Sequence, residues 1–96
     1  MITESIVKTP YGKSYMKRLC RHFAHKIPAA TEGNQGTIEF PFGICHINVS
    51  DQEMRFRVEV SNPEDLDRAE SVVGDHLVRM ANRDEPVVVW ERTNLP

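Results

Sequence analysis

The chain has 96 residues, of which 40% are hydrophobic and 27% are charged, and its formal net charge is −2. This length predicts a single domain over residues 1–96, with a modest core. The absence of a basic excess argues against a dedicated nucleic-acid-binding protein, and no apolar run approaches the roughly 20 residues that span a bilayer. The start of the chain lacks a basic-then-apolar signal pattern, so we expect a cytoplasmic protein with no nucleic-acid and no membrane partner.

The first third of the chain predicts a strand, a helix and a turn. Residues 5–9 are expected to form a strand that stops at Pro10, because proline has no amide proton for the ladder. Residues 11–27 follow a helical period, and Pro28 ends it. Residues 32–36, E-G-N-Q-G, form a turn rich in residues that tolerate positive φ. The buried arc of the helix is Met16, Leu19, Cys20, Phe23 and Ile27.

Three strands are predicted next, over residues 37–40, 44–50 and 53–61. In each of them apolar residues alternate with polar residues, which is typical of an antiparallel sheet with one buried face and one exposed face. The exposed face is expected to meet solvent or a partner. Its predicted residues are Glu39, His46, Asn48, Arg55, Arg57 and Glu59.

The last third predicts a second helix and a final strand. Asn62 is expected to cap the helix and Pro63 to occupy its first position, with the pattern running to about residue 83. Residues 87–92 form the last strand. The order β-α-β-β-β-α-β predicts an α+β two-layer sandwich, a ferredoxin-like variant with both helices on one face of the sheet. The buried stripe of the second helix is Leu66, Ala69, Val73, Leu77 and Met80.

The segment C-R-H-F-A-H-K, residues 20–26, combines one thiol with two imidazoles. Helical geometry places Cys20 roughly 140–160° from His22 and His25 around the helix axis, so the three cannot share one metal ion. His22 and His25 alone would supply only two of the three or four protein ligands that zinc usually takes. The basic residues beside them would repel a cation and favour an anion such as phosphate or carboxylate. We therefore predict no metal site here.

His76 lies at the edge of the second apolar stripe, and two interpretations of it stay open. It is either a core histidine bonded to a backbone carbonyl, or it faces Cys45 as a base or as a second soft ligand. The second interpretation predicts a Cys45 thiol of lowered pKa. With only two cysteines in a reducing compartment we expect free thiols, and a regulatory disulfide between Cys20 and Cys45 is the minor alternative.

Charge is distributed unevenly along the chain. Residues 5–31 contain six basic side chains and no acidic one, whereas acids outnumber bases from Asp51 onward. Such asymmetry can attract an anionic ligand, or let two subunits complement each other. No sequence signature of a catalytic site, a nucleotide-binding loop or a cofactor is present.

Three segments resemble a bacterial family called domain of unknown function 2218. They are L-C-R-H-F-A-H-K at Leu19–Lys26, G-T-I-E-F-P-F-G-I-C at Gly36–Cys45, and D-H-L-V-R-M-A-N-R-D-E at Asp75–Glu85. Met80 stands where this family usually has an aromatic residue. The resemblance covers nearly the whole chain, but the family has no assigned reaction. Some members look linked to siderophore-interacting ferric reductase domains, which implies a role in iron acquisition.

Three functions follow as expectations. The first is a small module that binds an anionic or iron-chelate ligand, and the second is a homodimeric structural or protein-interaction domain. The third is a small enzyme that uses Cys45 with His76. The sequence assigns no cofactor and no catalytic residue. The ligand-binding residues that the resemblance implies are His25, Lys26, Cys45, His76 and Arg79.

Overall fold

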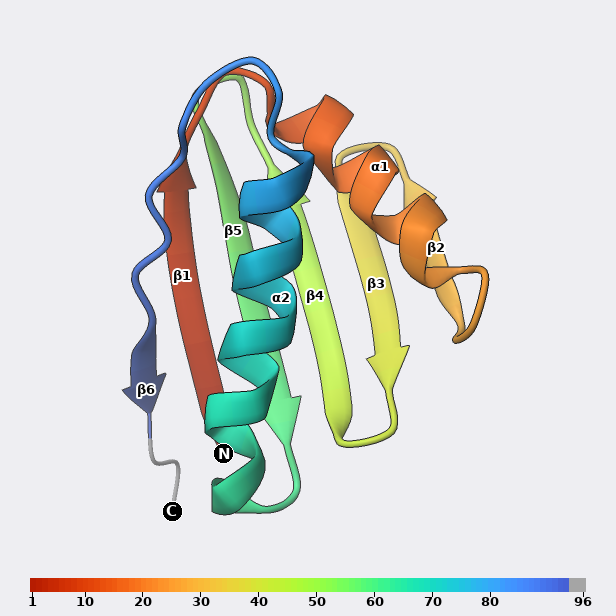
Figure 1. The fold of residues 1–96 in the computed structure, drawn as a ribbon, viewed down its shortest axis with the longest axis vertical. Helices are drawn as coiled ribbons and strands as arrows, with labels where there is room; N and C mark the ends of the chain where they lie inside the picture. The colour runs from red at the N-terminus through yellow and green to blue at the C-terminus, as the bar shows by residue number, and fades with distance from the viewer. Residues whose placement is uncertain (94–96) are drawn as a thin grey trace.

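The computed structural model describes residues 1–93 and shows one antiparallel sheet with two helices on one of its faces (Figure 1). The helices are α1 (Gly12–Phe23) and α2 (Leu66–Met80), and a 3-10 turn, η1 (Pro63–Asp65), precedes α2. The predicted α+β two-layer sandwich is confirmed. The strands are β1 (Ile2–Lys8), β2 (Ala29–Glu32), β3 (Gln35–Phe40), β4 (Gly43–Val49), β5 (Glu53–Val60) and β6 (Glu91–Thr93).

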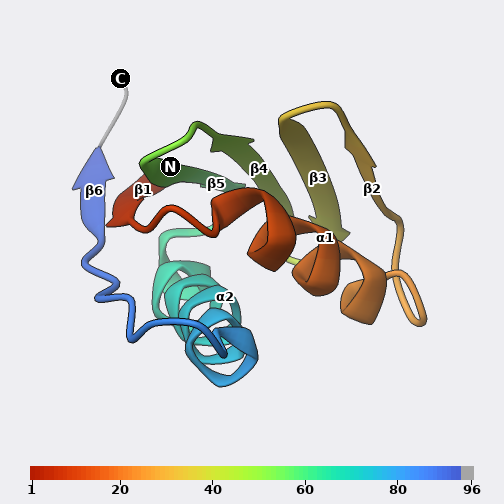
Figure 2. The same ribbon diagram turned by 90° about the horizontal axis from the view of Figure 1, so that it is seen from above.

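The strands lie in the order β2-β3-β4-β5-β1-β6, and every neighbouring pair is antiparallel. Figure 2 shows both helices against the same face of this sheet. Because successive side chains of a strand point to opposite faces, only one face of each strand contributes to the core. The fully buried core residues come from both layers and include Tyr15, Met16, Leu19, Ile38, Cys45, Ile47, Met54, Val58, Ala69, Val73 and Leu77.

Strand β2 was not predicted, so the observed order is β-α-β-β-β-β-α-β. Its sequence, A-A-T-E, contains two alanines, which favour strands weakly, and has no large apolar residue. The strand forms because Gly33, with φ +59°, closes a tight hairpin that pairs β2 with β3. The sequence predicted this turn but did not predict β2, the strand that precedes it.

Both helices are shorter than predicted. Helix α1 ends at Phe23 rather than at Ile27, in keeping with the tendency of a residue before proline to avoid the helical region. Helix α2 starts at Leu66, after the η1 turn, and ends at Met80. Asn62 occupies the predicted N-cap position, before η1, with Pro63 next, but its side chain makes no capping hydrogen bond. Within residues 1–93, neither helix is long and apolar enough to cross a membrane.

The last strand is also shorter than predicted, since ladder pairing with β1 begins only at Glu91. Residues 87–90, before this strand, still alternate between exposed and half-buried side chains. Val87 and Val89 are exposed, whereas Val88 and Trp90 are half-buried and pack against the core. The segment thus covers the core with side chains before it joins the sheet.

A buried hydroxyl joins the start of α1 to the chain after α2. Tyr15 is fully buried and donates to Asp84 Oδ1 at 2.5 Å, while its oxygen accepts from the amides of Arg83 and Asp84 at 3.1 and 3.2 Å. The other carboxylate oxygen accepts from Thr9 at 2.6 Å. Tyr15 and Asp84 together therefore join residues 9–15 to the chain after α2.

A second network fixes β6 to α2. Glu70 accepts from the buried Thr3 hydroxyl at 2.7 Å and from two nitrogens of Arg92 at 3.0 Å each. Arg92 also pairs with Asp67. The hydrogen bonds from Arg92, more than that from Thr3, lower the pKa of Glu70. The carboxylate form of Glu70 therefore holds the edge strand in place.

Removing the Tyr15 hydroxyl should destabilise the domain. The substitution Tyr15→Phe leaves Asp84 Oδ1 and the amides of Arg83 and Asp84 without the tyrosine hydroxyl as a partner, which costs about 1–3 kcal/mol for a buried group. Urea unfolding measures this loss, and Tyr11→Phe is the matched control because that ring is exposed and makes a cation–π contact that phenylalanine keeps. Equal stability of the two variants would show that the Tyr15 hydroxyl carries no such role.

Stability should also depend on the ionisation of Glu70. The pKa of Glu70 is lower in the folded chain than its ordinary value of about 4.3, so its stabilisation is complete above that value and is lost as the pH falls through the folded pKa. We expect Glu70→Gln to lose less stability than the unmodified chain between pH 6 and pH 3, as followed by urea unfolding. The control is Glu64→Gln, an exposed residue of η1, which should retain the full pH dependence. An unchanged slope in Glu70→Gln contradicts the prediction.

Candidate functional site

The five residues that the sequence implied as ligand-binding lie in different environments. His25 and Lys26 are exposed in the turn after α1, and Arg79 is exposed near the end of α2. His76 is half-buried on α2. Cys45 is completely buried on the helix-facing side of β4. A surface ligand can therefore reach the first four side chains but not Cys45, and ligand binding by these residues stays a prediction.

His76 makes the backbone contact that one interpretation of the sequence required. Its Nδ1 lies 2.7 Å from the carbonyl oxygen of Val72, one turn earlier on the same helix. Since a carbonyl only accepts, Nδ1 carries the proton and the neutral ring keeps a free lone pair on Nε2. No hydrogen bond within residues 1–93 joins His76 to Cys45. The ring instead packs against α1.

An aromatic cluster lies where α1, α2 and the β3–β4 hairpin meet. The ring of His76 has its centroid 5.1 Å from that of His22 and 4.8 Å from that of Phe23. Phe23 meets Phe40 edge-to-face at 5.0 Å, and Phe40 stacks on Phe42 at 4.9 Å. We call these five residues the aromatic seam. It runs from the nearly buried Phe40 to the half-buried Phe23 and Phe42 and the exposed His22.

Local backbone structure places these rings. His22 and Phe23 close the last turn of α1, Phe40 ends β3, and Phe42 is the second residue of the two-residue turn between β3 and β4. The turn can pack against β5 only because Gly43 lacks a side chain, since a Cβ atom there would lie 2.1 Å from the backbone oxygen of Glu59. A glycine is therefore required where the start of β4 pairs with the end of β5.

The surroundings of the aromatic seam are cationic. The guanidinium of Arg68 stands 5.0 Å above the centre of the Phe42 ring. Arg18 precedes His22 by four residues and Arg79 follows His76 by three, which are the spacings of neighbours on a helix surface. Within the described part of the chain, no ion pair involves Arg18, Arg68 or Arg79, nor the predicted Lys26. Their charge is available to an incoming anion.

The sequence singled out part of this site and missed the rest. His76 and Arg79 were named, whereas His22 was treated as a surface residue and Arg68 was not considered. One signal was present in F-P-F, residues 40–42, where a phenylalanine at the end of a strand and a second one in the tight turn after it can lie close together. The contact between His22 and His76 is tertiary, and no periodicity in either helix reveals it.

Both cysteines are free buried thiols. Burial raises the pKa of Cys45 to about 12, and the nearby Cys20 adds to this effect. Burial also raises the pKa of Cys20. The predicted lowering of the Cys45 pKa by His76 is therefore wrong. Cys20 is buried while His22 and His25 are exposed, as the helical angles predicted.

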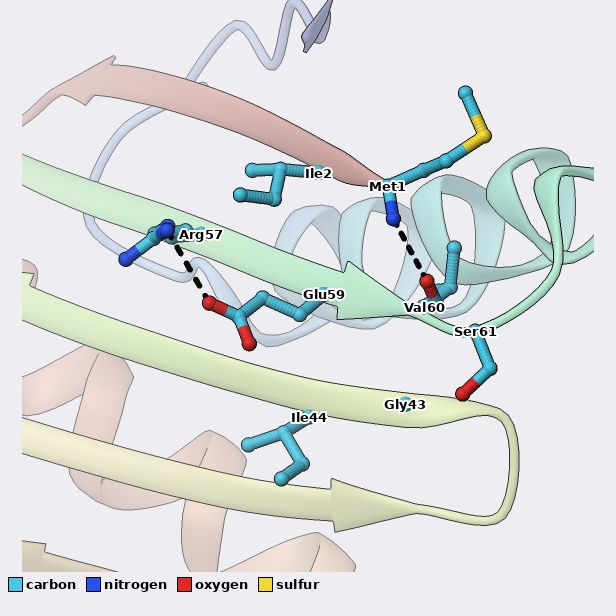
Figure 3. A pocket seen from close by; sticks show the side chains of 8 residues that line it. All are labelled: Met1, Ile2, Gly43, Ile44, Arg57, Glu59, Val60 and Ser61. Atoms are coloured by element: carbon cyan, nitrogen blue, oxygen red, sulfur yellow. Dashed lines mark hydrogen bonds and ion pairs between the residues drawn. The ribbon is translucent and has the colours of Figure 1, made fainter. Parts of the chain in front are cut away.

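The outer face of the sheet is a second surface with polar side chains. It presents the predicted Glu39, His46, Asn48, Arg55, Arg57 and Glu59. Its hollow of about 420 Å³ lies between the starts of β1 and β4 and the end of β5 (Figure 3). There Arg57 pairs with Glu59 at 3.2 Å, and the Met1 amino group donates to the Val60 oxygen at 2.9 Å. These charges are satisfied internally, so the aromatic seam is the better candidate site.

The structure is a small α+β sandwich of one sheet and two helices, with Arg68 over a ring of the aromatic seam and Arg18 and Arg79 close in sequence to its two histidines. The chain belongs to a bacterial family described as "Uncharacterized protein conserved in bacteria (DUF2218)", whose model matches residues 4–91. The resemblance seen in the sequence is thus confirmed.

A solved structure has the same fold. The NMR structure of PA4090 from Pseudomonas aeruginosa is 28% identical, has a TM-score of 0.77, and the alignment covers 94% of each chain. A comparison with curated proteins found no match. None of these findings bears on the predicted iron or siderophore link or on the homodimer, which stay predictions.

The buried thiol of Cys45 should be inert in the folded chain. With a pKa of about 12, only about one thiol in ten thousand is ionised at pH 8, against roughly a quarter for an ordinary cysteine. We expect iodoacetamide to modify Cys45 at least about a thousandfold more slowly in the native chain than in the same chain unfolded in urea, measured by peptide mass spectrometry. A native Cys45 that reacts as fast as in urea contradicts this and revives the enzyme hypothesis.

Proposed function

We propose that this domain is a non-catalytic binding module that takes up a small planar anion at the aromatic seam, with an aromatic iron chelate as one member of that ligand class. The single observation that carries the proposal is the arrangement of unpaired arginines around partly exposed rings, with Arg68 seated over Phe42. Rings and cations together suit a ligand that is both flat and negatively charged.

The two kinds of contact would act on different parts of the ligand. The half-buried ring of Phe23 offers aromatic surface to the ligand, while Phe42, which stacks on Phe40, holds the Arg68 guanidinium beside it. Arg68 and Arg79 offer planar groups that donate hydrogen bonds to carboxylate, phenolate or phosphate oxygens. His25 and Lys26, in the turn after α1, are the further donors that the sequence implied. Within residues 1–93, none of these four side chains makes an ion pair with a carboxylate, so each can donate hydrogen bonds to a ligand.

The chemistry of the two cysteines favours binding over catalysis. A thiol with a raised pKa inside the core is a poor nucleophile. The groups at the aromatic seam, by contrast, are donors and rings that recognise a ligand without forming a bond to it. The proposal therefore retains the ligand-binding expectation and not the enzyme.

Removal of the two arginines should weaken binding of the anion. Loss of a hydrogen bond to a charged group costs about 1.5–3 kcal/mol, or about tenfold or more in affinity. We expect the double variant Arg68→Gln/Arg79→Gln to bind a catechol carboxylate and its ferric complex at least about tenfold more weakly, as measured by calorimetry and by amide NMR shifts. Inorganic phosphate, which has no ring, should bind more weakly than either ligand.

The matched control is the double variant Arg55→Gln/Arg57→Gln, which removes the same charge from the outer face of the sheet. It should bind like the unmodified chain. Two results would overturn the proposal: no binding of any of the three ligands tighter than about millimolar, or equal losses in both double variants. The second result would mean that total charge, and not the aromatic seam, attracts the anion.

A further inference from the structure

Two of the four histidines of the chain meet across the contact between the helices. His22 comes from the last turn of α1 and His76 from the third turn of α2, and their ring centroids are 5.1 Å apart with 45° between the ring planes. The sequence had paired His22 only with His25 of the same helix. The fold supplies a partner on a different element.

We propose that His22 and His76 form a two-imidazole site for a borderline transition-metal ion such as Zn²⁺ or Ni²⁺. This inference goes beyond anion binding, because it assigns the two imidazoles a ligand of the opposite charge. A metal site of this kind joins α1 to α2 through the ion.

The separation of the rings fits one shared ion. An imidazole nitrogen binds zinc at about 2.0–2.1 Å, which places the ring centroid roughly 3.2 Å from the metal. Two such rings at the tetrahedral angle have centroids about 5.2 Å apart. The observed distance of 5.1 Å matches this spacing.

The hydrogen bond of His76 prepares the ring to act as a ligand. Because Nδ1 donates to the Val72 carbonyl at 2.7 Å, the Nε2 atom carries the lone pair. Histidines that bind metals nearly always donate their other nitrogen to a carboxylate or a carbonyl in this way, which fixes the tautomer and raises the basicity of the ligand. In a histidine that binds no metal, the same hydrogen bond would only give the ring N–H group a partner.

The remaining coordination positions decide what kind of site this is. Within residues 1–93, no group of three or more histidine, cysteine or acidic side chains is arranged around one ion. Water or an exogenous anion would therefore complete the tetrahedron, as in sites that keep an open position. Imidazole ligands without carboxylates select zinc, nickel or copper over magnesium and calcium. The arginines at positions 18 and 79 repel a cation, so the affinity is expected to be moderate.

The test uses the full chain without a purification tag, titrated with Zn²⁺, Ni²⁺ and Mg²⁺ by calorimetry and by amide NMR. The expected result is binding of one Zn²⁺ or one Ni²⁺ per chain and none of Mg²⁺, with Ni²⁺ broadening the signals around residues 22 and 76. His22→Ala and His76→Ala should each weaken binding at least about tenfold. His22 is exposed, so its variant keeps the fold even where the His76 variant is destabilised.

The other two histidines provide matched controls. His25→Ala removes an imidazole from the turn after α1, and His46→Ala removes one from the outer face of the sheet. Both should bind the metal like the unmodified chain. Binding that survives His22→Ala, or that falls equally in His25→Ala or His46→Ala, overturns the proposal. Failure of this site and failure of the anion site are distinguishable, because Arg68→Gln/Arg79→Gln should leave one metal ion bound per chain.

Discussion

The one-sided burial of the sheet determines where the rest of the structure can lie. Alternation along β4 and β5 gives these strands a single apolar face, so both helices must pack on that face. Two helices on one sheet of this width come into contact with each other. The last turn of α1 then meets α2, and the β3–β4 turn fills the space beside them. The aromatic seam is a consequence of this packing.

Two polar networks hold this arrangement at opposite ends of α2. Tyr15 binds the chain just after the helix through Asp84, and Glu70 binds β6 near its start through Arg92. Both networks use groups from segments far apart in sequence, so neither can form until the sheet and helices have assembled. They fix the position of α2 relative to α1 and to β1. The contact between His22 and His76 depends on that position, although neither residue belongs to either network.

The parts of the fold that follow from periodicity were predictable. The apolar stripe of α2 and the alternation of β5 were correct because burial imposes a regular spacing on the residues that face the core. Strand β2 was missed because A-A-T-E gains its structure from pairing with β3 and not from a pattern of its own. The candidate site likewise has one part that the sequence predicts and one part that it does not. A half-buried His76 bonded to a carbonyl follows from its helix, but its partner His22 follows only from the packing of two helices, which the sequence does not encode locally.

The location of each reactive group bears on the kind of chemistry this domain can perform. The most nucleophilic side chain that the sequence offered to an enzyme, Cys45, is inside the core, with Ile38 and Val58 beside it on the neighbouring strands. A charge on that sulfur would have to form without water, which is why the pKa of the thiol is raised. The imidazoles of His22 and His76 and the guanidiniums of Arg68 and Arg79 lie on the helices, and only His76 among them is half-buried. The two thiols are therefore buried while these donor groups are accessible, as the proposed binding module requires.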